Sequence, residues 1–194
     1  IKMFVRNGYH PVVIVSQPFE SPEESAYRHK DVELRRIPIV PVHNEVKKDE
    51  SFDADVEALT VALDKALEDI DVVITHDVVY QNAALKHNFA ARRIAQKRPE
   101  LKWLHWIHSA TSPVTLDNLR PYFTDEYLNT IRQPFPNCHY VFFNEYSKPR
   151  VAVNFNVSEE KVRTVHHPTD VCEFLGISKE VESIVDRKKM LESD

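Results

Sequence analysis

Glycine is the scarcest informative residue in this chain of 194 residues, since only Gly8 and Gly176 are present. Loops that cradle a phosphate need several glycines, because backbone N–H groups must approach the anion closely. We therefore predict that the chain binds neither a dinucleotide nor ATP in the usual way and has no cofactor. Cysteine is equally scarce: Cys138 and Cys172 imply no disulfide framework and indicate a reducing compartment.

Long apolar runs and an excess of positive charge are also missing. No run approaches the roughly 18 residues of a membrane span, and no signal peptide is evident, which favours the cytoplasm. The net charge of −5 differs from that of the clearly basic domains that bind nucleic acid. The Gly-x-Ser-x-Gly motif is absent, and neither cysteine lies in a nucleophile motif. Paired carboxylates for glycoside hydrolysis stay open, although no pair is singled out.

Apolar runs alternate along the chain with helical patterns. Hydrophobic residues make up 42% of the sequence, which is enough for a sizeable core. The runs rich in β-branched and aromatic residues predict strands at 12–15, 72–75, 101–107, 140–143 and 162–165. Helices are predicted from Ser51 to Ile70, from Tyr80 to Lys97, and after Ser147, with Pro149 in the first turn. This alternation predicts an α/β fold, a Rossmann-like parallel sheet with helices on both faces.

The remaining segments complete the prediction. Residues 1–7 resemble the end of a helix stopped by Gly8, so we expect an earlier strand and loop to be missing from the chain. Further predictions are a loop at 17–30, an edge strand or strand end with two prolines at 37–42, an irregular helix at 115–132 and a charged helix from Gly176.

Polar residues follow four of the predicted strands. They are His76 and Asp77, then His105 to His108, then Asn144 and Glu145, and finally His166 and His167. Ligands of such folds bind at the carboxyl ends of the strands. The sequence therefore predicts a polar crevice along one edge of the sheet.

His76 and Asp77 form the most informative pair, because imidazole titrates near neutral pH and can donate to or accept from a sugar hydroxyl. The alternative is that Asp77 caps a helix beside a structural histidine. His105 and His108 have a spacing that suggests a metal motif, but strand side chains alternate sides, so one of them should face the crevice and the other should be packed. We predict no metal site.

A cluster of basic residues surrounds the predicted helix that ends at Lys97. The simplest interpretation is a solvated helix face. The functional alternative is contact with anionic lipid, as a peripheral membrane protein, or with an acidic partner, near Arg92 and Arg93. The cluster consists of Lys86, Arg92, Arg93, Lys97, Arg98 and Lys102.

In order and spacing, these motifs resemble the amino-terminal domain of family 4-type glycosyltransferases with the GT-B architecture. The likeness covers nearly the whole chain. The segments that carry it are Ile1–Ser16, Asp71–Asp77, Leu104–His108, Phe143–Ser147 with Val151 to Val162, and His167–Asp170 with Phe174.

The resemblance implies two Rossmann-like domains that face each other across a cleft, and sugar transfer with retention of configuration and generally without a metal. The carboxyl-terminal domain would hold most of the nucleotide-sugar. By position, His76 would contact the transferred sugar near the reacting carbon, and Asp77, His105, His108 and Asn144 would be further candidates for substrate contact.

The sequence departs from the family pattern in three ways. The first strand with its glycine-rich loop is absent, the second domain is absent, and Pro168 and Thr169 replace the usual glycine before Asp170. We therefore expect residues 1–175 to form the acceptor-side domain and residues 176–194 to form a linker or helix towards the second domain.

The predicted function is the acceptor-side half of a retaining glycosyltransferase, inactive by itself. Its partners would be a nucleotide-sugar donor and a sugar or lipid-type acceptor, and not nucleic acid. Two alternatives stay open: a non-catalytic binding or regulatory domain of the same fold, and a flavodoxin-like or hydrolase α/β domain with its own small-molecule site.

Overall fold

A computed structural model describes residues 1–16, 30–38, 40, 50–81, 84–108, 132–166, 181 and 183–184. The strands are β1 (Val12–Ser16), β2 (Glu33–Ile37), β3 (Val72–His76), β4 (Lys102–Trp106), β5 (Cys138–Phe142) and β6 (Val162–Thr164). The helices are α1 (Lys2–Arg6), α3 (Phe52–Ala66), α4 (Leu85–Lys97), α6 (Lys148–Asn154) and the 3-10 helix η3 (Glu159–Lys161). The chain divides into two compact units, Ile1–Thr164 and Val165–Asp194, and all of these elements belong to the first.

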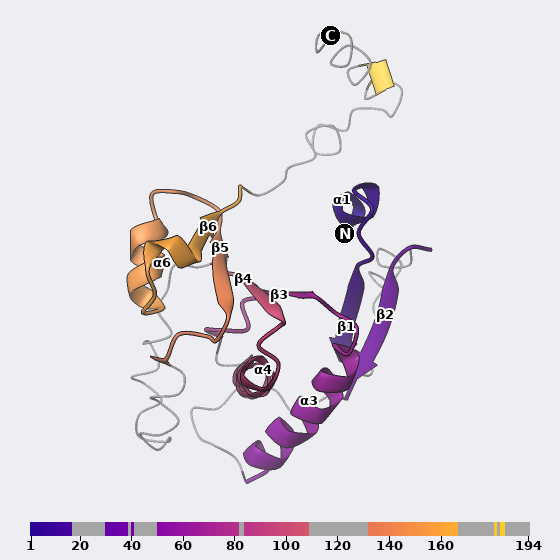
Figure 1. Ribbon diagram of the computed structural model, residues 1–194, viewed down its shortest axis with the longest axis vertical. Coiled ribbons are helices and arrows are strands. Elements are labelled where there is room, and N and C mark those ends of the chain that lie inside the picture. The colour runs from indigo at the N-terminus through magenta and orange to yellow at the C-terminus, as the bar shows by residue number, and fades with distance from the viewer. Residues whose placement is uncertain are drawn as a thin grey trace. The chain divides into compact units, whose positions relative to one another are not determined.

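The strands form two parallel sheets (Figure 1). β1 pairs with β2, and the larger sheet has the order β3-β4-β5-β6. Parallel neighbours require a crossover between them, which α4 supplies between β3 and β4 and α6 supplies between β5 and β6. The predicted α/β class with a parallel, Rossmann-like sheet is confirmed, although the described strands make two sheets and not one.

Helix α3 forms where the apolar stripe predicted it. Ser51 precedes its first turn, which carries Asp53 and Asp55 where the helix dipole favours negative charge. Phe52, Val56 and Leu59 are buried, and α3 packs against α4.

Two clusters of buried side chains make the core. The larger joins α4 and α6 to the four-stranded sheet, and the smaller joins α3 to the β1–β2 pair. Ile14 and Leu63 pack against both clusters, so the two clusters adjoin each other.

The edge strand or strand end predicted at 37–42 falls partly outside the described residues, at 39, 41 and 42, and within the described part only Ile37 is in a strand, at its end. β2 is Glu33–Ile37 and ends just before Pro38, whose ring nitrogen carries no hydrogen for a ladder bond. The charged residues of β2 do not fit the apolar pattern that predicts a strand. In the fold, Arg35 forms ion pairs with Glu33 and Asp69 and donates to the carbonyl of Ala66.

Other boundaries also shift. α4 begins at Leu85 and not at Tyr80, because residues 77–81 form a turn in which the N–H of Gln81 donates to the carbonyl of Asp77. The predicted loop at 17–30 and the helix at 115–132 lie outside the described residues except at their last positions. So does the region from Gly176, apart from residues 181, 183 and 184.

Tight turns in this glycine-poor chain use Asp and Asn. Gly8, after α1, has a φ of 78°. Asp77, Asn137 and Asn156 have φ values of 58°, 47° and 52°, in the left-handed region that non-glycine residues seldom occupy. The Asn137 side chain also donates to the carbonyls of Pro99 and Leu101, and so links the turn before β5 to the start of β4.

Candidate functional site

His76 is the last residue of β3, and its side chain is exposed. Register places it beside Trp106 at the end of β4, and the two rings stack with their centroids 5.9 Å apart. The prediction singled out His76 but not Trp106. Trp106 could have been found, because parallel pairing of the two predicted strands aligns their last residues.

His108 also contacts the His76 ring. The His76 Nδ1 atom is 3.1 Å from the His108 Nε2 atom, and the rings stack with centroids 5.4 Å apart. Such a hydrogen bond requires one of these nitrogens to carry a proton and the other to accept it. Partial burial lowers the pKa of His76, and the nearby His108 lowers it further, while the Asp77 carboxylate opposes both effects.

Asp77 holds the turn that follows β3. Its Oδ1 atom accepts hydrogen bonds from the backbone N–H of His108, at 2.9 Å, and from the Tyr80 hydroxyl. Its Oδ2 atom accepts a longer one from Gln81, at 3.4 Å. The carboxylate therefore ties the ends of β3 and β4 together. The sequence did not predict Tyr80 as a residue of the site. Its position three residues after Asp77 could have indicated the contact, because a turn brings such residues together.

His105 is in the core and not in the crevice. Its side chain is 0% exposed, its Nδ1 atom is hydrogen-bonded to the Thr75 hydroxyl at 2.8 Å, and its ring lies 4.2 Å from that of Phe135 between centroids. Burial lowers the pKa of His105 to about 3, and the positive charge of Arg92 contributes. His105 thus corrects the candidate set, because strand alternation buries it and leaves His108 exposed.

Asn144 follows β5 and is half-buried. Its Oδ1 atom accepts a hydrogen bond from the N–H of Ser147, at 2.8 Å, just before α6. Its neighbour Glu145 accepts a hydrogen bond from the Thr164 hydroxyl on β6. The structure thus brings His76, Asp77 and His108 together and gives Asn144 a local bond at the start of α6.

No group of three or more metal-ligating side chains lies close enough to hold an ion within the described residues. His166 is exposed, and His167 is outside the described part of the chain. In the same part of the chain, no helix is both long and apolar enough to cross a bilayer.

The basic residues of α4 belong largely to the packing of the fold. Lys86 is 1% exposed and pairs with Asp55 at 2.6 Å. Arg92 is buried, where it donates to Asn88 and to the carbonyls of Gln133 and Pro134 and lies over the Phe135 ring.

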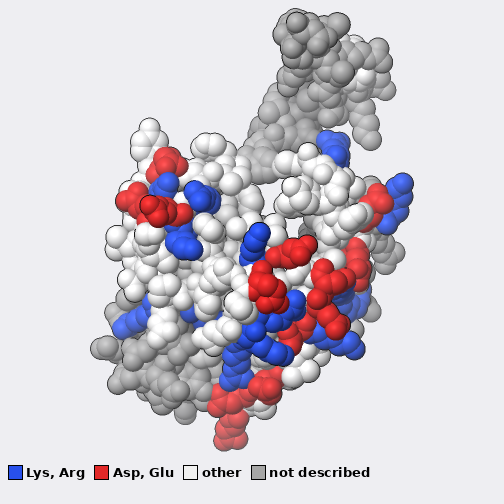
Figure 2. Space-filling view, viewed as in Figure 1, with Lys and Arg blue, Asp and Glu red and all other residues white. Residues whose placement is uncertain are grey.

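The exposed cations of this helix are paired as well. Arg93 pairs with Glu57, and Lys97 pairs with Asp64. Figure 2 shows Lys and Arg interspersed with Asp and Glu over this side of the molecule. Of the two residues suggested for a lipid contact, Arg92 is buried and Arg93 is paired with Glu57. The interpretation as a solvated helix face is also wrong for Lys86 and Arg92, because both are buried.

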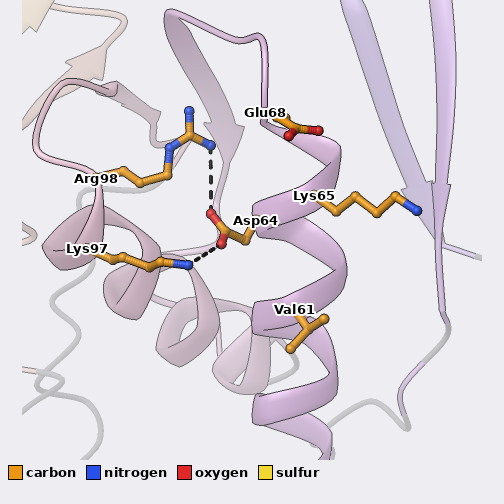
Figure 3. A pocket seen from close by; sticks show the side chains of 6 residues that line it. All are labelled: Val61, Asp64, Lys65, Glu68, Lys97 and Arg98. Atoms are coloured by element: carbon orange, nitrogen blue, oxygen red, sulfur yellow. Dashed lines mark hydrogen bonds and ion pairs between the residues drawn. The ribbon is translucent and has the colours of Figure 1, made fainter.

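A hollow lies on the outside of the α3–α4 layer (Figure 3). Asp64 points between Lys97 and Arg98 and binds both, at 2.5 Å and 3.7 Å. Three of the charged residues that line the hollow are therefore paired with one another, and none of the lining residues lies at a strand end. The lining residues are Val61, Asp64, Lys65, Glu68, Lys97 and Arg98. We do not regard this hollow as the functional site.

Comparison with models of protein families and with curated proteins finds no match to this chain.

Proposed function

We propose that this chain is the acceptor-side domain of a retaining glycosyltransferase that transfers a sugar from a nucleotide-sugar to a sugar or lipid-type acceptor. The observation that supports this most directly is the exposed His76–His108 pair at the carboxyl ends of two adjacent parallel strands. Ligands of open α/β sheets bind at this edge. Two neighbouring imidazoles offer both donors and acceptors, as sugar hydroxyls require.

In this proposal His76 contacts the transferred sugar, and the Trp106 ring supports His76 by stacking on it. His108 binds a neighbouring hydroxyl. Asp77 acts as a positioning residue, because its Oδ1 atom already accepts two hydrogen bonds that fix the turn carrying the site. Asn144 is a more distant contact. The phosphates would be held outside this chain, since its two glycines leave no loop suited to them.

Sugar binding can be tested by NMR on this chain. Methyl glucoside, methyl mannoside, UDP-glucose, GDP-mannose and UDP alone would be titrated while the ring signals of His76, His108 and Trp106 are followed. We expect saturable shifts with one or more of the sugars and none with UDP. His76→Ala should abolish the shifts, and His10→Ala, at an exposed histidine ahead of β1, should keep them. The proposal is contradicted if no ligand shifts the ring signals, or if His76→Ala leaves the ligand-induced shifts unchanged.

Catalysis needs a second experiment on the whole protein that contains this chain. His76→Ala is expected to lower kcat/KM for sugar transfer by at least about 100-fold, the usual effect of removing a group at the reacting centre. Sugar binding at His76 without any transfer would favour a non-catalytic binding or regulatory domain.

A further inference from the structure

His76 and His108 share a hydrogen bond between the Nδ1 atom of His76 and the Nε2 atom of His108, which are 3.1 Å apart. This bond uses one nitrogen of each ring. In the part of the chain that the structure describes, the other nitrogen of His76, Nε2, has no hydrogen-bond partner. Because the His76 side chain is exposed, Nε2 is the atom through which this ring can bind a ligand.

The position of the proton in the shared bond decides what the Nε2 atom of His76 offers to a ligand. A neutral imidazole carries a hydrogen on one ring nitrogen and a lone pair on the other. If His76 donates in the shared bond, its Nε2 atom is an acceptor. If His108 donates, the Nε2 atom of His76 is a donor. The neutral pair therefore suits a hydroxyl group in both arrangements, because a hydroxyl group also donates and accepts.

One added proton removes this choice. The ring that takes the proton carries hydrogens on both nitrogens, and the other ring must then accept in the shared bond through its bonded nitrogen. The hydrogen of that other ring is consequently on its outer nitrogen. Whichever ring holds the charge, the Nε2 atom of His76 is a donor and the pair is cationic. A second added proton would place hydrogens on both bonded nitrogens and would break the shared bond.

The groups around His76 both oppose and support its charge. Burial lowers the pKa of His76 and the nearby His108 lowers it further, whereas the Asp77 carboxylate in the turn after β3 raises it. The Tyr80 hydroxyl and the backbone N–H of His108 both donate to that carboxylate, which weakens the repulsion between Asp77 and a ligand anion. Trp106 on β4 stacks on the His76 ring and carries no ionisable group.

We propose that the His76–His108 pair is a one-proton switch of ligand class: the neutral pair suits a hydroxyl group of a neutral sugar, and one added proton gives it a preference for an oxyanion, the carboxylate or phosphate of a charged sugar. An oxyanion only accepts hydrogen bonds, so it gains from a charged donor, and a charge-assisted hydrogen bond is roughly twice as strong as a neutral one. A hydroxyl group gains little, because it binds a donor or an acceptor. This inference rests on the proposed sugar contact of His76 and adds the class of ligand that each charge state selects.

Two matched ligands test the switch on this chain. Methyl glucoside has a neutral CH2OH group where methyl glucuronide has a carboxylate, and this carboxyl group keeps its charge at both pH 7.5 and pH 6.0. NMR titrations at the two pH values give the dissociation constants. We expect the affinity for methyl glucuronide to rise by at least about threefold at the lower pH and the affinity for methyl glucoside to stay unchanged.

Glucose 6-phosphate, titrated in the same way, distinguishes the two kinds of oxyanion. A gain with either anion at the lower pH supports the switch, and a gain with only one identifies the oxyanion that fits the site. At the higher pH the lowered pKa of His76 keeps its ring uncharged, in agreement with the lack of binding expected for UDP.

Two variants and a proton count assign the effect to this pair. His76→Gln keeps a side chain that donates and accepts but cannot titrate, so the ratio of the two affinities should no longer change with pH. His10→Gln, at the exposed histidine ahead of β1, should keep the change. Calorimetry of methyl glucuronide binding in two buffers of different ionisation enthalpy should show an uptake of no more than one proton.

His108→Gln is the variant that tests the shared bond. Glutamine can still donate or accept towards the Nδ1 atom of His76, but it cannot take up a proton. The gain in affinity for methyl glucuronide should therefore persist and begin at a higher pH, because His108 no longer opposes the charge on His76.

The switch is overturned if pH changes the affinities for the neutral and the anionic sugars equally, if more than one proton is taken up, or if His76→Gln keeps the change in ratio. Binding of methyl glucoside without a gain for either anion overturns the switch and leaves the proposed sugar contact in place. If none of the three ligands binds at either pH, the proposed sugar contact of His76 is wrong as well.

Discussion

Helix α4 and the ends of β3 and β4 both gather side chains that can carry positive charge, and they use them in opposite ways. On α4, Lys86 and Arg92 are buried and bound to fixed partners. At the strand ends, His76 and His108 are exposed and hydrogen-bonded to each other. The first group stabilises the fold, and the second is open to solvent at the edge of the sheet. Ionisable residues therefore become informative about function only when their burial and partners are known.

The sharpest test of this contrast is the neighbouring pair Arg92 and Arg93. Arg92→Ala removes hydrogen bonds to two backbone carbonyls and the contact with Phe135, so we expect a loss of about 3 kcal/mol in the free energy of unfolding. Arg93→Ala removes only an exposed pair with Glu57 and should change it by less than about 1 kcal/mol. Urea unfolding measures both. Equal losses in the two variants would contradict the expectation that the buried Arg92 contributes more to the free energy of unfolding than the exposed Arg93.

His105 offers the next largest effect, through pH. Its pKa in the fold is about 3, whereas the unfolded chain has the ordinary value near 6.5. The unfolded state therefore binds a proton at a higher pH than the folded state does. The stabilising contribution is complete above about pH 6.5 and is lost progressively as the pH falls towards 3.

His105→Leu should remove this dependence. Between pH 7 and pH 5 the unchanged chain should lose roughly 2 kcal/mol more stability than the variant, at about 1.4 kcal/mol per pH unit below 6.5. Parallel urea titrations at the two pH values give the difference. Identical pH slopes for the two proteins would show that His105 titrates normally and is not enclosed.

The smallest expected effects concern the exposed histidines. His108→Ala removes a neighbour that disfavours the charged His76 ring, so the pKa of His76 should rise. Asp77→Asn removes the negative charge that favours it, so the pKa of His76 should fall. NMR titration of the ring signals resolves the two directions, with His139 on β5 as an internal reference. If the pKa of His76 shifted in the same direction in both variants, His108 and Asp77 would not have the opposite effects on it that are described above.

The sequence predicted much of the fold because most strands are apolar runs and most helices have an apolar stripe. The part of β2 ahead of Ile37 was not predicted because Arg35 and Arg36 interrupt its apolar pattern, and Asp69, the ion-pair partner of Arg35, lies far along the chain. The division into two sheets was not predictable from periodicity, since pairing between strands depends on contacts distant in sequence.

The candidate site was predicted in part. His76, Asp77 and His108 follow directly from the rule that polar residues at parallel strand ends share one edge. The burial of His105 follows from alternation, but the choice between His105 and His108 required knowing where β4 ends. Trp106 and Tyr80 needed the register and the turn, which no single segment of sequence contains.

The left-handed residues Asp77 and Asn137 have a consequence for the unfolded chain. Glycine at either position would adopt the same backbone without strain, but it would also leave the denatured chain more conformations to lose on folding. A non-glycine residue there costs about 1 kcal/mol or more of backbone strain in the folded chain. In return, the unfolded chain has fewer conformations, and the side chain can link two strands. Because these turns use Asp or Asn in place of glycine, their side chains form hydrogen bonds between neighbouring strands. Replacing either residue by glycine would relieve the backbone strain of the turn but would remove those hydrogen bonds.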